Sequence, residues 1–340
     1  MKLRFILLLM LIGAIGILLF RAQTAFPNRQ LDAVEALPEL ALDENALALR
    51  LAEAVRLPTI SYDDRQKFDA AAFEAFHDLL VDRYPRIHAV AGQRKIANYS
   101  LVYKIEGADP GLLPALFMGH IDVVPVDPAT VSDWLHAPFS GDIAQGSVWG
   151  RGAMDDKLTV MALMEAMEHL LARGERPART VYFAFGHDEE VGGKEGAAKI
   201  AEHFAKQSLR FEFVLDEGGA VTNGLLPGID GPVAIIGIAE KGYVNLHLDV
   251  DAPGGHSSQP PEHTAAGILA AALVKVEANP FPPDLSTMDA HLSYLAHHMP
   301  FRSRLALANR WLFSPIIKNT LLANPATAAS IRTTTAVTML

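Results

Sequence analysis

The sequence predicts an α/β protein with a doubly wound sheet, and two observations support this fold class. Between residues 100 and 215, short apolar runs of strand length alternate with longer stretches of helical periodicity, as in proteins built from strand–helix–strand units. Clusters of acidic residues and glycines follow the predicted strands, and ligands bind at the carboxyl ends of the strands in open α/β sheets. The larger domain is therefore expected to carry a ligand site at one edge of its sheet.

The predicted elements of this larger domain, residues 44–231, follow one another in a regular order. Apolar residues at helical spacing predict four helices, at residues 44–56, 68–81, 157–173 and 193–206. Short apolar runs predict four strands, at residues 100–105, 113–118, 179–185 and 211–215. Gly174 directly follows the third helix, and glycine is typical of that position.

The pattern changes after Gly219, and residues 232–340 predict a smaller α+β domain. Residues 243–251 alternate strictly between apolar and polar side chains, which indicates a strand with one solvated face in an antiparallel sheet. A helix is expected at residues 263–278. Residues 280–324 form a proline-flanked insertion that favours helices and contains many apolar side chains.

The N-terminal segment, residues 1–21, is expected to be either a signal anchor or a cleaved signal peptide. It consists of MKLR, sixteen uncharged and mostly apolar residues from Phe5 to Phe20, and Arg21. As a helix the apolar stretch would reach about 24 Å, somewhat less than the ~30 Å hydrocarbon core of a bilayer. The basic residues of MKLR place the N-terminus in the cytoplasm, so the body of the protein is expected to be membrane-anchored and facing outside the cytoplasm, or secreted or periplasmic. Residues 22–43, which are polar and contain prolines, predict a linker.

The composition excludes several classes of function. A net charge of −10, with no basic cluster, argues against nucleic acid as a partner. The chain has thirteen histidines and no cysteine, which excludes disulfides, thiolate metal sites and a cysteine nucleophile. Any metal ion must therefore be held by nitrogen and oxygen ligands.

Four acidic clusters are predicted to meet at one edge of the sheet. MGHIDVVP begins at the end of the second strand, GHDEE follows the third, and LDEGG follows the fourth, while WGRGAMDDK opens the helix at residues 157–173. Because the carboxyl ends of such strands share an edge, these separate segments converge there. Two like charges 4 Å apart repel by about 4 kcal/mol at an effective dielectric near 20. So many gathered carboxylates therefore indicate a site for metal ions.

The spacing within the clusters suits two metal ions. In an extended chain His120 and Asp122 point to the same side, so Asp122 can accept a hydrogen bond from one imidazole nitrogen while the other binds metal. If Glu189 and Glu190 lie in an extended segment, their side chains point apart, and one can bind metal while its neighbour faces the attacking water. Asp155, preceded by the small residues of GRGAM, can bridge two ions ~3.5–4 Å apart that polarise a carbonyl group.

Each cluster alone has a simpler interpretation. An HxD sequence is more often a surface pair, DEE a solvated turn, LDEGG a turn, and MDDK the start of a helix, where acidic residues favour the first turn. All four together, in this order and at predicted strand ends, favour the metal site.

These motifs resemble those of the di-zinc metallopeptidase family that contains aminoacylase, carboxypeptidase S and bacterial glutamate carboxypeptidase. The likeness runs from about Leu47 to the last residue and includes GHIDVVPV, WGRGAMDDK, GHDEEVGG, LDEGG, EKG, GGHSSQPP, NRWLFSP and IRTTTAVTML. It implies two zinc ions, with Co²⁺ or Mn²⁺ as alternatives. It also implies that residues 44–231 are a catalytic domain and that residues 232–340 are a lid, through which such proteins dimerise.

The resemblance extends to individual metal ligands. His120 resembles a ligand of one zinc ion, Asp155 the carboxylate that bridges both, and Glu190 a ligand of the other. Asp216 resembles a further ligand, a role that falls in some relatives to the next acid, here Glu217.

Three more residues resemble catalytic groups of the family. Asp122 resembles the carboxylate that orients the histidine ligand. Glu189 resembles the general base, which takes a proton from water and delivers it to the leaving amine. His256, in GGHSSQPP, resembles a lid histidine that stabilises the oxyanion, often across a dimer interface. Without the resemblance, His256 would be interpreted as a polar loop residue.

The resemblance implies a hydrolase that cleaves the amide bond of N-acyl or N-fatty-acyl amino acids or small peptides. Two alternatives are a carboxypeptidase acting on short peptides and, from another class, a non-catalytic metal- or ligand-binding module tethered to the membrane. The family's last metal ligand is a histidine near the end of the complete catalytic domain. No histidine after His256 lies in a matching motif, so the sequence is expected to be truncated within the lid.

Overall fold

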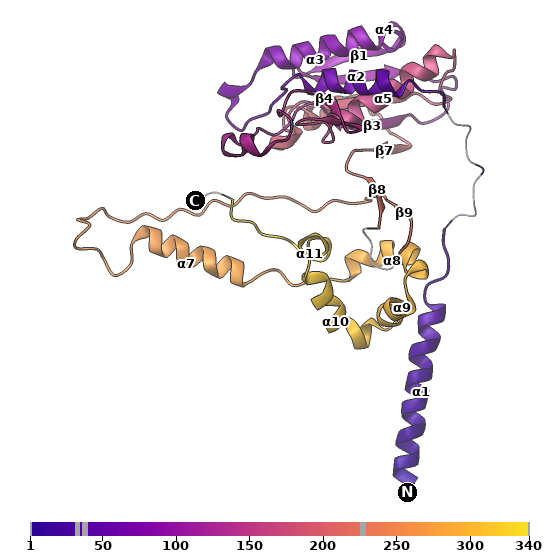
Figure 1. The fold of residues 1–340 in the computed structure, drawn as a ribbon, viewed down its shortest axis with the longest axis vertical. Coiled ribbons are helices and arrows are strands. Elements are labelled where there is room, and N and C mark those ends of the chain that lie inside the picture. Colours follow the sequence, from indigo (N-terminus) through magenta and orange to yellow (C-terminus); the bar gives the residue numbers. More distant parts are fainter. Residues whose placement is uncertain (1, 31–34, 36–39, 225–228, 339–340) are drawn as a thin grey trace. The chain divides into compact units, whose positions relative to one another are not determined.

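The computed structural model describes residues 2–30, 35, 40–224 and 229–338 of the chain (Figure 1). The chain divides into two compact units, one formed by residues 38–218 and the other by residues 1–37 and 219–340. The predicted linker, residues 22–43, lies partly outside the described residues.

A mixed sheet of five strands forms the centre of the unit at residues 38–218. Its strands are β1 (Gly92–Ile96), β2 (Ser100–Ile105), β3 (Ala115–His120), β6 (Val181–Gly186) and β7 (Phe213–Leu215), in the order β1-β2-β6-β3-β7. β3 is parallel to both of its neighbours, β6 and β7, while β2 is antiparallel to β1 and β6. The carboxyl ends of β3, β6 and β7 therefore lie at one edge, as the sequence predicts. A separate hairpin consists of β4 (Asp142–Ala144) and β5 (Ser147–Trp149).

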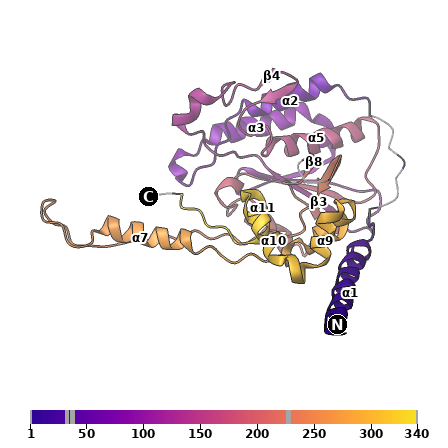
Figure 2. The same ribbon diagram turned by 60° about the horizontal axis from the view of Figure 1, so that its bottom comes forward.

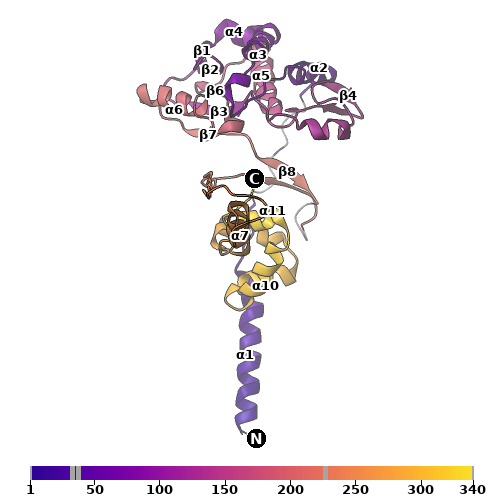
Figure 3. The ribbon, with the colours of Figure 1, turned by 90° about the vertical axis from the view of Figure 1, so that its left-hand side faces the viewer.

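Helices cover both faces of this sheet (Figure 3). The helices of the unit are α2 (Glu44–Val55), α3 (Ala70–Arg83), α4 (Pro85–Val90), α5 (Lys157–Ala172) and α6 (Ala197–Lys206). Side chains of α2 to α5 pack on the face that includes Tyr103 and Phe183. Two residues of α6, Ile200 and Phe204, pack with Tyr182 on the other face. The α/β class is confirmed, while the doubly wound arrangement stays a prediction.

The local sequence explains the start and the packing of α3. The Asp69 side chain accepts hydrogen bonds from the N–H groups of the first helical turn, which stabilises a helix N-terminus. Phe73, Phe76 and Leu80 recur at helical spacing and are completely buried. This helix forms part of the layer that holds the sheet in place.

Several boundaries differ from the sequence-based expectations. β3 begins two residues later than predicted and ends at His120, so this histidine is the last residue of the strand. β1 was not predicted, because its sequence GQRKI is polar and four of its five residues are exposed. An exposed edge strand needs no apolar face, and its pairing with β2 alone defines it.

The other unit contains the N-terminal helix α1 (Lys2–Thr24) and the C-terminal region. α1 extends three residues past the predicted end at residue 21. The C-terminal region has a hairpin, β8 (Ala220–Asn223) and β9 (Pro232–Ile235), and the helices α7 (Ala265–Ala278), α8 (Asp289–Leu295), α9 (Phe301–Ala308), α10 (Arg310–Leu322) and α11 (Pro325–Ile331). The helix at 263–278 and the helical character of the 280–324 insertion are confirmed.

The strand expected at residues 243–251 does not form. No residue of this stretch pairs with another strand in the part of the chain that the structure describes, and Tyr243 and Leu246 are more than four-fifths exposed. Alternation predicts which face of a strand is buried, but a strand also needs a neighbour for its backbone hydrogen bonds. Without such a neighbour, the pattern alone does not produce a strand.

Candidate metal centre

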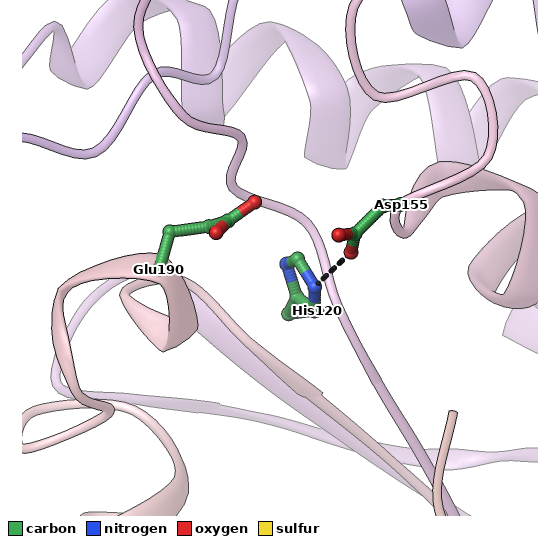
Figure 4. A group of neighbouring side chains, drawn as sticks. All are labelled: His120, Asp155 and Glu190. Atoms are coloured by element: carbon green, nitrogen blue, oxygen red, sulfur yellow. Dashed lines mark hydrogen bonds and ion pairs between the residues drawn. The ribbon is translucent and has the colours of Figure 1, made fainter. Parts of the chain in front are cut away.

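Three of the predicted ligands meet at the sheet edge. His120 ends β3, Asp155 lies in the loop before α5, and Glu190 lies in a turn after β6. Each offers one ligand atom, and these three atoms lie within 4.8 Å of one another. Figure 4 shows Asp155 and Glu190 on opposite sides of the imidazole ring of His120. The predicted convergence of these three residues is thus seen in the structure.

The two nitrogens of His120 have different surroundings. Nδ1 lies 3.0 Å from the backbone carbonyl oxygen of Asp122 and 3.3 Å from its side-chain Oδ1. Nε2 faces Asp155 Oδ1 at 3.0 Å. Both nitrogens therefore face acceptors, and Nε2 is the one on the side of Asp155, so a metal ion would take the place of a proton on Nε2 while Nδ1 keeps its proton for Asp122.

Asp122 organises more of the site than the histidine alone. Its completely buried carboxylate accepts hydrogen bonds from the Ser61 hydroxyl at 2.6 Å and from the N–H groups of Glu189 and Glu190 at 3.1 and 3.2 Å. Burial alone would raise the pKa of Asp122, but hydrogen bonds from His120 and Ser61 outweigh it and lower that pKa. One ionised side chain thus joins the histidine to the turn that bears both glutamates.

The turn that bears both glutamates differs from the extended segment that was expected there. Glu189–Val191 is a 3₁₀ turn rather than an extended segment. Successive side chains still diverge, because a 3₁₀ helix has three residues per turn and rotates each by about 120°. Glu189 Oε2 lies 3.9 Å from His120 Nε2. Gly192, with φ of 95°, closes the turn in a conformation that favours glycine.

Asp156 is a residue of the site that sequence reasoning did not single out. It is buried, and its Oδ2 accepts a hydrogen bond from the backbone N–H of His120 at 3.0 Å. A Cβ atom on Gly119 would lie 2.7 Å from that oxygen, so glycine is required for the close approach. Lys157, also buried, donates to the carbonyl oxygen of Ala54 at 2.9 Å. These contacts hold the loop that carries Asp155 against β3 and α2.

The charges of the site are strongly coupled. Burial alone would lower the pKa of His120, but its hydrogen bond and charge interaction with Asp122, together with nearby acids, raise it to about 10. Burial and neighbouring carboxylates raise the pKa of Glu189 and of Glu190. Burial raises the pKa of Asp156 to about 6. Negative charge is therefore in excess at this edge of the sheet.

The remaining predicted residues lie outside the three-residue group. Asp216 follows β7 and is exposed, and its charge helps to raise the pKa of Glu189. Glu217 is less exposed, and burial and the charge of Asp156 raise its pKa to about 7. His256 belongs to the other unit, where its Nδ1 accepts a hydrogen bond from the N–H of Ser258 at 3.3 Å. The roles of these residues stay predictions.

The donor set fits a divalent metal ion. It offers one imidazole nitrogen fixed by a carboxylate partner and several carboxylate oxygens, the ligands expected for zinc and related ions in a chain without cysteine. The three ligand atoms come from separate segments that are each held by backbone hydrogen bonds. A metal ion would therefore meet a largely formed site.

Comparison with known proteins places the chain in a family. The chain is 43% identical over 302 residues to "Probable carboxypeptidase S-like 2" of Dictyostelium discoideum, covering 88% of this chain and 58% of that protein. It is 39% identical over 337 residues to "N-fatty-acyl-amino acid synthase/hydrolase PM20D1" of Xenopus tropicalis, covering 97% and 65%. The chain thus spans about three-fifths of the length of these curated relatives.

Among solved structures, an M20 family metallo-carboxypeptidase from Sulfolobus solfataricus is 26% identical and superposes with a TM-score of 0.42, over 53% of this chain and 38% of that one. Residues 116–303, more than half of the chain, match Peptidase family M20/M25/M40. The chain belongs to this peptidase family.

Proposed function

We propose that this protein is a metal-dependent hydrolase that cleaves the amide bond of N-acyl amino acids or small peptides. The observation that carries the proposal is the convergence of His120, Asp155 and Glu190 within 4.8 Å, beside a second glutamate at position 189. Membership of the peptidase family supports it. So do the names of the two relatives, of which one is a carboxypeptidase S-like protein and the other an N-fatty-acyl-amino acid synthase/hydrolase.

In this proposal the metal ions are two zinc ions, held by His120, Asp155 and Glu190. Asp216 or Glu217 completes the set. Glu217 is more buried than Asp216, and its pKa responds to the charges of Asp156, His120 and Asp155. Both observations favour Glu217 as the metal ligand. When bound, such ions polarise a substrate carbonyl and lower the pKa of water.

Glu189 is the general base in this mechanism. Its carboxylate is half exposed and lies beside the ligand histidine, and its backbone is fixed by Asp122. It takes a proton from the attacking water and delivers it to the nitrogen of the leaving amine as the amide bond breaks. Burial raises the pKa of Glu189, which brings a carboxylate closer to the pKa that suits a base near neutral pH.

A pocket beside the centre provides room for a substrate. It is lined by residues that include Glu190, Val191, Pro125, Tyr62 and Lys67. Lys67 lies over the ring of Tyr62 at 5.9 Å. An ammonium group in the lining of the same pocket as Glu190 suits the free carboxylate that acyl amino acids and peptides share.

The other unit takes the part of a lid in this proposal. His256 would stabilise the oxyanion as the amide carbonyl is attacked, and residues 232–340 would form the lid through which two copies dimerise. The chain would be anchored in the membrane with its body outside the cytoplasm, or be secreted or periplasmic, and the length and composition of α1 suit either a signal anchor or a signal peptide.

Glu189→Gln tests the reaction in the full-length protein. We expect a loss of about 10²–10⁴ in turnover with unchanged metal content, because glutamine keeps the shape but cannot take a proton. Glu195→Gln is the matched control, since Glu195 follows the same turn and its side chain makes a single long ion pair among the described residues, with Arg65 at 3.8 Å. Wild-type turnover in Glu189→Gln would contradict the proposed base.

The choice of substrate separates the remaining possibilities. Turnover of a long-chain acyl amino acid well above that of a dipeptide supports the acyl amino acid hydrolase, and the reverse supports a carboxypeptidase acting on short peptides. A metal-loaded full-length protein that hydrolyses neither would instead support a non-catalytic binding module.

A further inference from the structure

The helical insertion of the C-terminal region contacts the end of the N-terminal helix. The guanidinium group of Arg21 donates two hydrogen bonds to the backbone oxygen of Ala308, at 3.0 and 2.8 Å. The side-chain amide of Asn309 donates to the backbone oxygen of Leu18 at 3.1 Å. Ala22 is 1% exposed. The last turns of α1 are thus packed against α9 within one unit (Figures 1 and 2).

The rest of α1 has the properties of a membrane-spanning helix. The whole helix, with its packed last turns, is 23 residues long, and its most apolar 18 residues are not buried within the protein. At 1.5 Å per residue the whole helix reaches about 34 Å and its uncharged stretch, Phe5–Phe20, about 24 Å, so α1 spans a hydrocarbon core of ~30 Å together with the residues that flank this stretch. A signal peptide that is cleaved makes no lasting contact with the mature protein, so the contacts with α9 favour a retained helix.

The helix after this contact exposes an apolar face. α10 begins at Arg310, directly after Asn309, and its exposed apolar residues Trp311, Leu312, Pro315 and Ile316 share one side at helical spacing. The polar Asn319 and Thr320 continue this exposed side one turn later. Trp311 is 71% exposed and Ile316 is 62% exposed. Tryptophan and aliphatic residues on one side of a short helix are typical of elements that lie in the headgroup region of a membrane.

The charge of the same region points to a lipid surface. Residues 290–340 contain five arginines or lysines and no aspartate or glutamate, although the whole chain has a net charge of −10. One of the five, Arg310, is paired with Asp289 at 2.6 Å, which leaves four. Arg302 is exposed on α9, and Lys318 lies on α10. Basic groups next to an apolar face complement anionic lipid headgroups.

We propose that α9 and α10 lie in the headgroup layer of the membrane that α1 crosses, with Trp311, Leu312 and Ile316 inserted toward the acyl chains. The juxtaposition that carries this proposal is the apolar face of α10, which begins at Trp311, two residues after Asn309 contacts α1. The occupant of the face is therefore lipid rather than another protein. The proposal does not rest on the proposed hydrolase activity.

Spin labelling tests this placement, because the chain has no cysteine. A single nitroxide is attached at Ile316→Cys in the full chain, reconstituted in nanodiscs that contain anionic lipid. Its collision rates with oxygen, which concentrates in lipid, and with a water-soluble nickel chelate are then measured. We expect a higher ratio of oxygen to nickel collisions than for a water-exposed nitroxide. Ser314→Cys, on the other side of the same helix, is the matched control and should give a lower ratio.

Three results would overturn the proposal. Free access of the nickel chelate at position 316 would place the face of α10 in water. Protection of that position from both reagents would mean that protein covers it. Equal ratios at positions 316 and 314 would mean that the two sides of α10 are not distinguished by lipid. The intact mass of the protein from the membrane fraction provides an independent check, since loss of the first 24 residues would also contradict a retained α1.

Discussion

Replacing Asp122 by asparagine tests whether one buried carboxylate organises the metal centre. Asparagine keeps the volume but turns one oxygen into an NH₂ group that cannot accept a hydrogen bond. On the Oδ1 side, the NH₂ group would face the N–H of Glu189 and Nδ1 of His120. On the Oδ2 side it would face the Ser61 hydroxyl, which can rotate to accept, and the N–H of Glu190. The amide should therefore choose the Oδ2 side.

This choice leaves one buried N–H group without a partner. A hydrogen bond to a charged acceptor contributes about 1.5–3 kcal/mol, and His120 also loses its charge interaction with Asp122, so the free energy of unfolding of the metal-free protein should fall by at least that amount. Loss of a carboxylate behind a histidine ligand typically weakens metal binding about 10–100-fold. Because Nδ1 of His120 keeps the backbone oxygen of Asp122 at 3.0 Å, the tautomer is preserved, and we expect the lower end, about tenfold or 1.4 kcal/mol.

Two measurements separate these effects. Urea unfolding in the presence of a chelator reports stability, and competition with a chromophoric zinc chelator reports affinity. Asp188→Asn is the matched control, because the buried Asp188 also accepts two backbone N–H groups, those of Glu195 and Gly196, both at 2.8 Å. It should lose stability but bind zinc normally. Unchanged zinc affinity in a folded Asp122→Asn protein would refute the organising role of Asp122.

Three further predictions follow from the surroundings of the site. Gly119→Ala should displace Asp156, because the Asp156 oxygen would lie 2.7 Å from the new Cβ. The free energy of unfolding should fall by about 1–3 kcal/mol, and zinc should bind more weakly. Wild-type zinc affinity in this variant would contradict the need for glycine beside Asp156. Lys157→Met removes the donor of two backbone carbonyl groups, but it also removes a buried amine whose pKa burial lowers to about 7. The free energy of unfolding in urea titrations should therefore fall by only about 1–3 kcal/mol, and a more stable variant would show that the Lys157 amine is not needed. Burial lowers the pKa of His77 below its usual value of 6.5, so the unfolded chain takes the proton more readily and the free energy of unfolding should fall as the pH drops below 6.5. In His77→Gln the free energy of unfolding should fall less between pH 7.5 and 5, roughly the window of the shift. An equal fall in both proteins would contradict this assignment.

The convergence of the site could be predicted because it depends on few features of the chain. Short apolar runs identify β3, β6 and β7, and parallel strands bring the residues that follow them to one edge. The conformation at that edge was harder to predict. Two adjacent glutamates have no local preference strong enough to reveal the 3₁₀ turn at Glu189–Val191, which is fixed by hydrogen bonds to Asp122 from another segment.

Residues that support the site from a distance left little signal in the sequence. Ser61 contacts Asp122 because residues 60 and 123 form a β-bridge, and no local pattern announces that pairing. Asp155 and Asp156 are identical neighbours, and only tertiary packing decides which of them is buried. Gly119, directly before the histidine, was the one available clue, since a glycine inside a strand often marks the close approach of another segment.

The balance of charge at the sheet edge gives the strongest physical reason for a bound cation. Among the residues that the structure describes, no lysine or arginine forms an ion pair with any acid of the site, namely Asp122, Asp155, Asp156, Glu189, Glu190, Asp216 or Glu217. The nearest lysine in sequence, Lys157, donates to backbone oxygens instead.

Within the described part of the chain, the imidazole of His120 is therefore the one cationic group beside several carboxylates. Two carboxylates 4 Å apart repel each other by about 4 kcal/mol at an effective dielectric near 20. The chain responds by raising the pKa of Glu217 to about 7 and that of Asp156 to about 6. The fold holds the acids together through hydrogen bonds to Asp122 and Asp156 but provides no protein cation to neutralise them. Backbone hydrogen bonds thus hold carboxylates close together although these groups repel one another. Divalent ions that bind between the carboxylates would offset this repulsion, which explains the arrangement best.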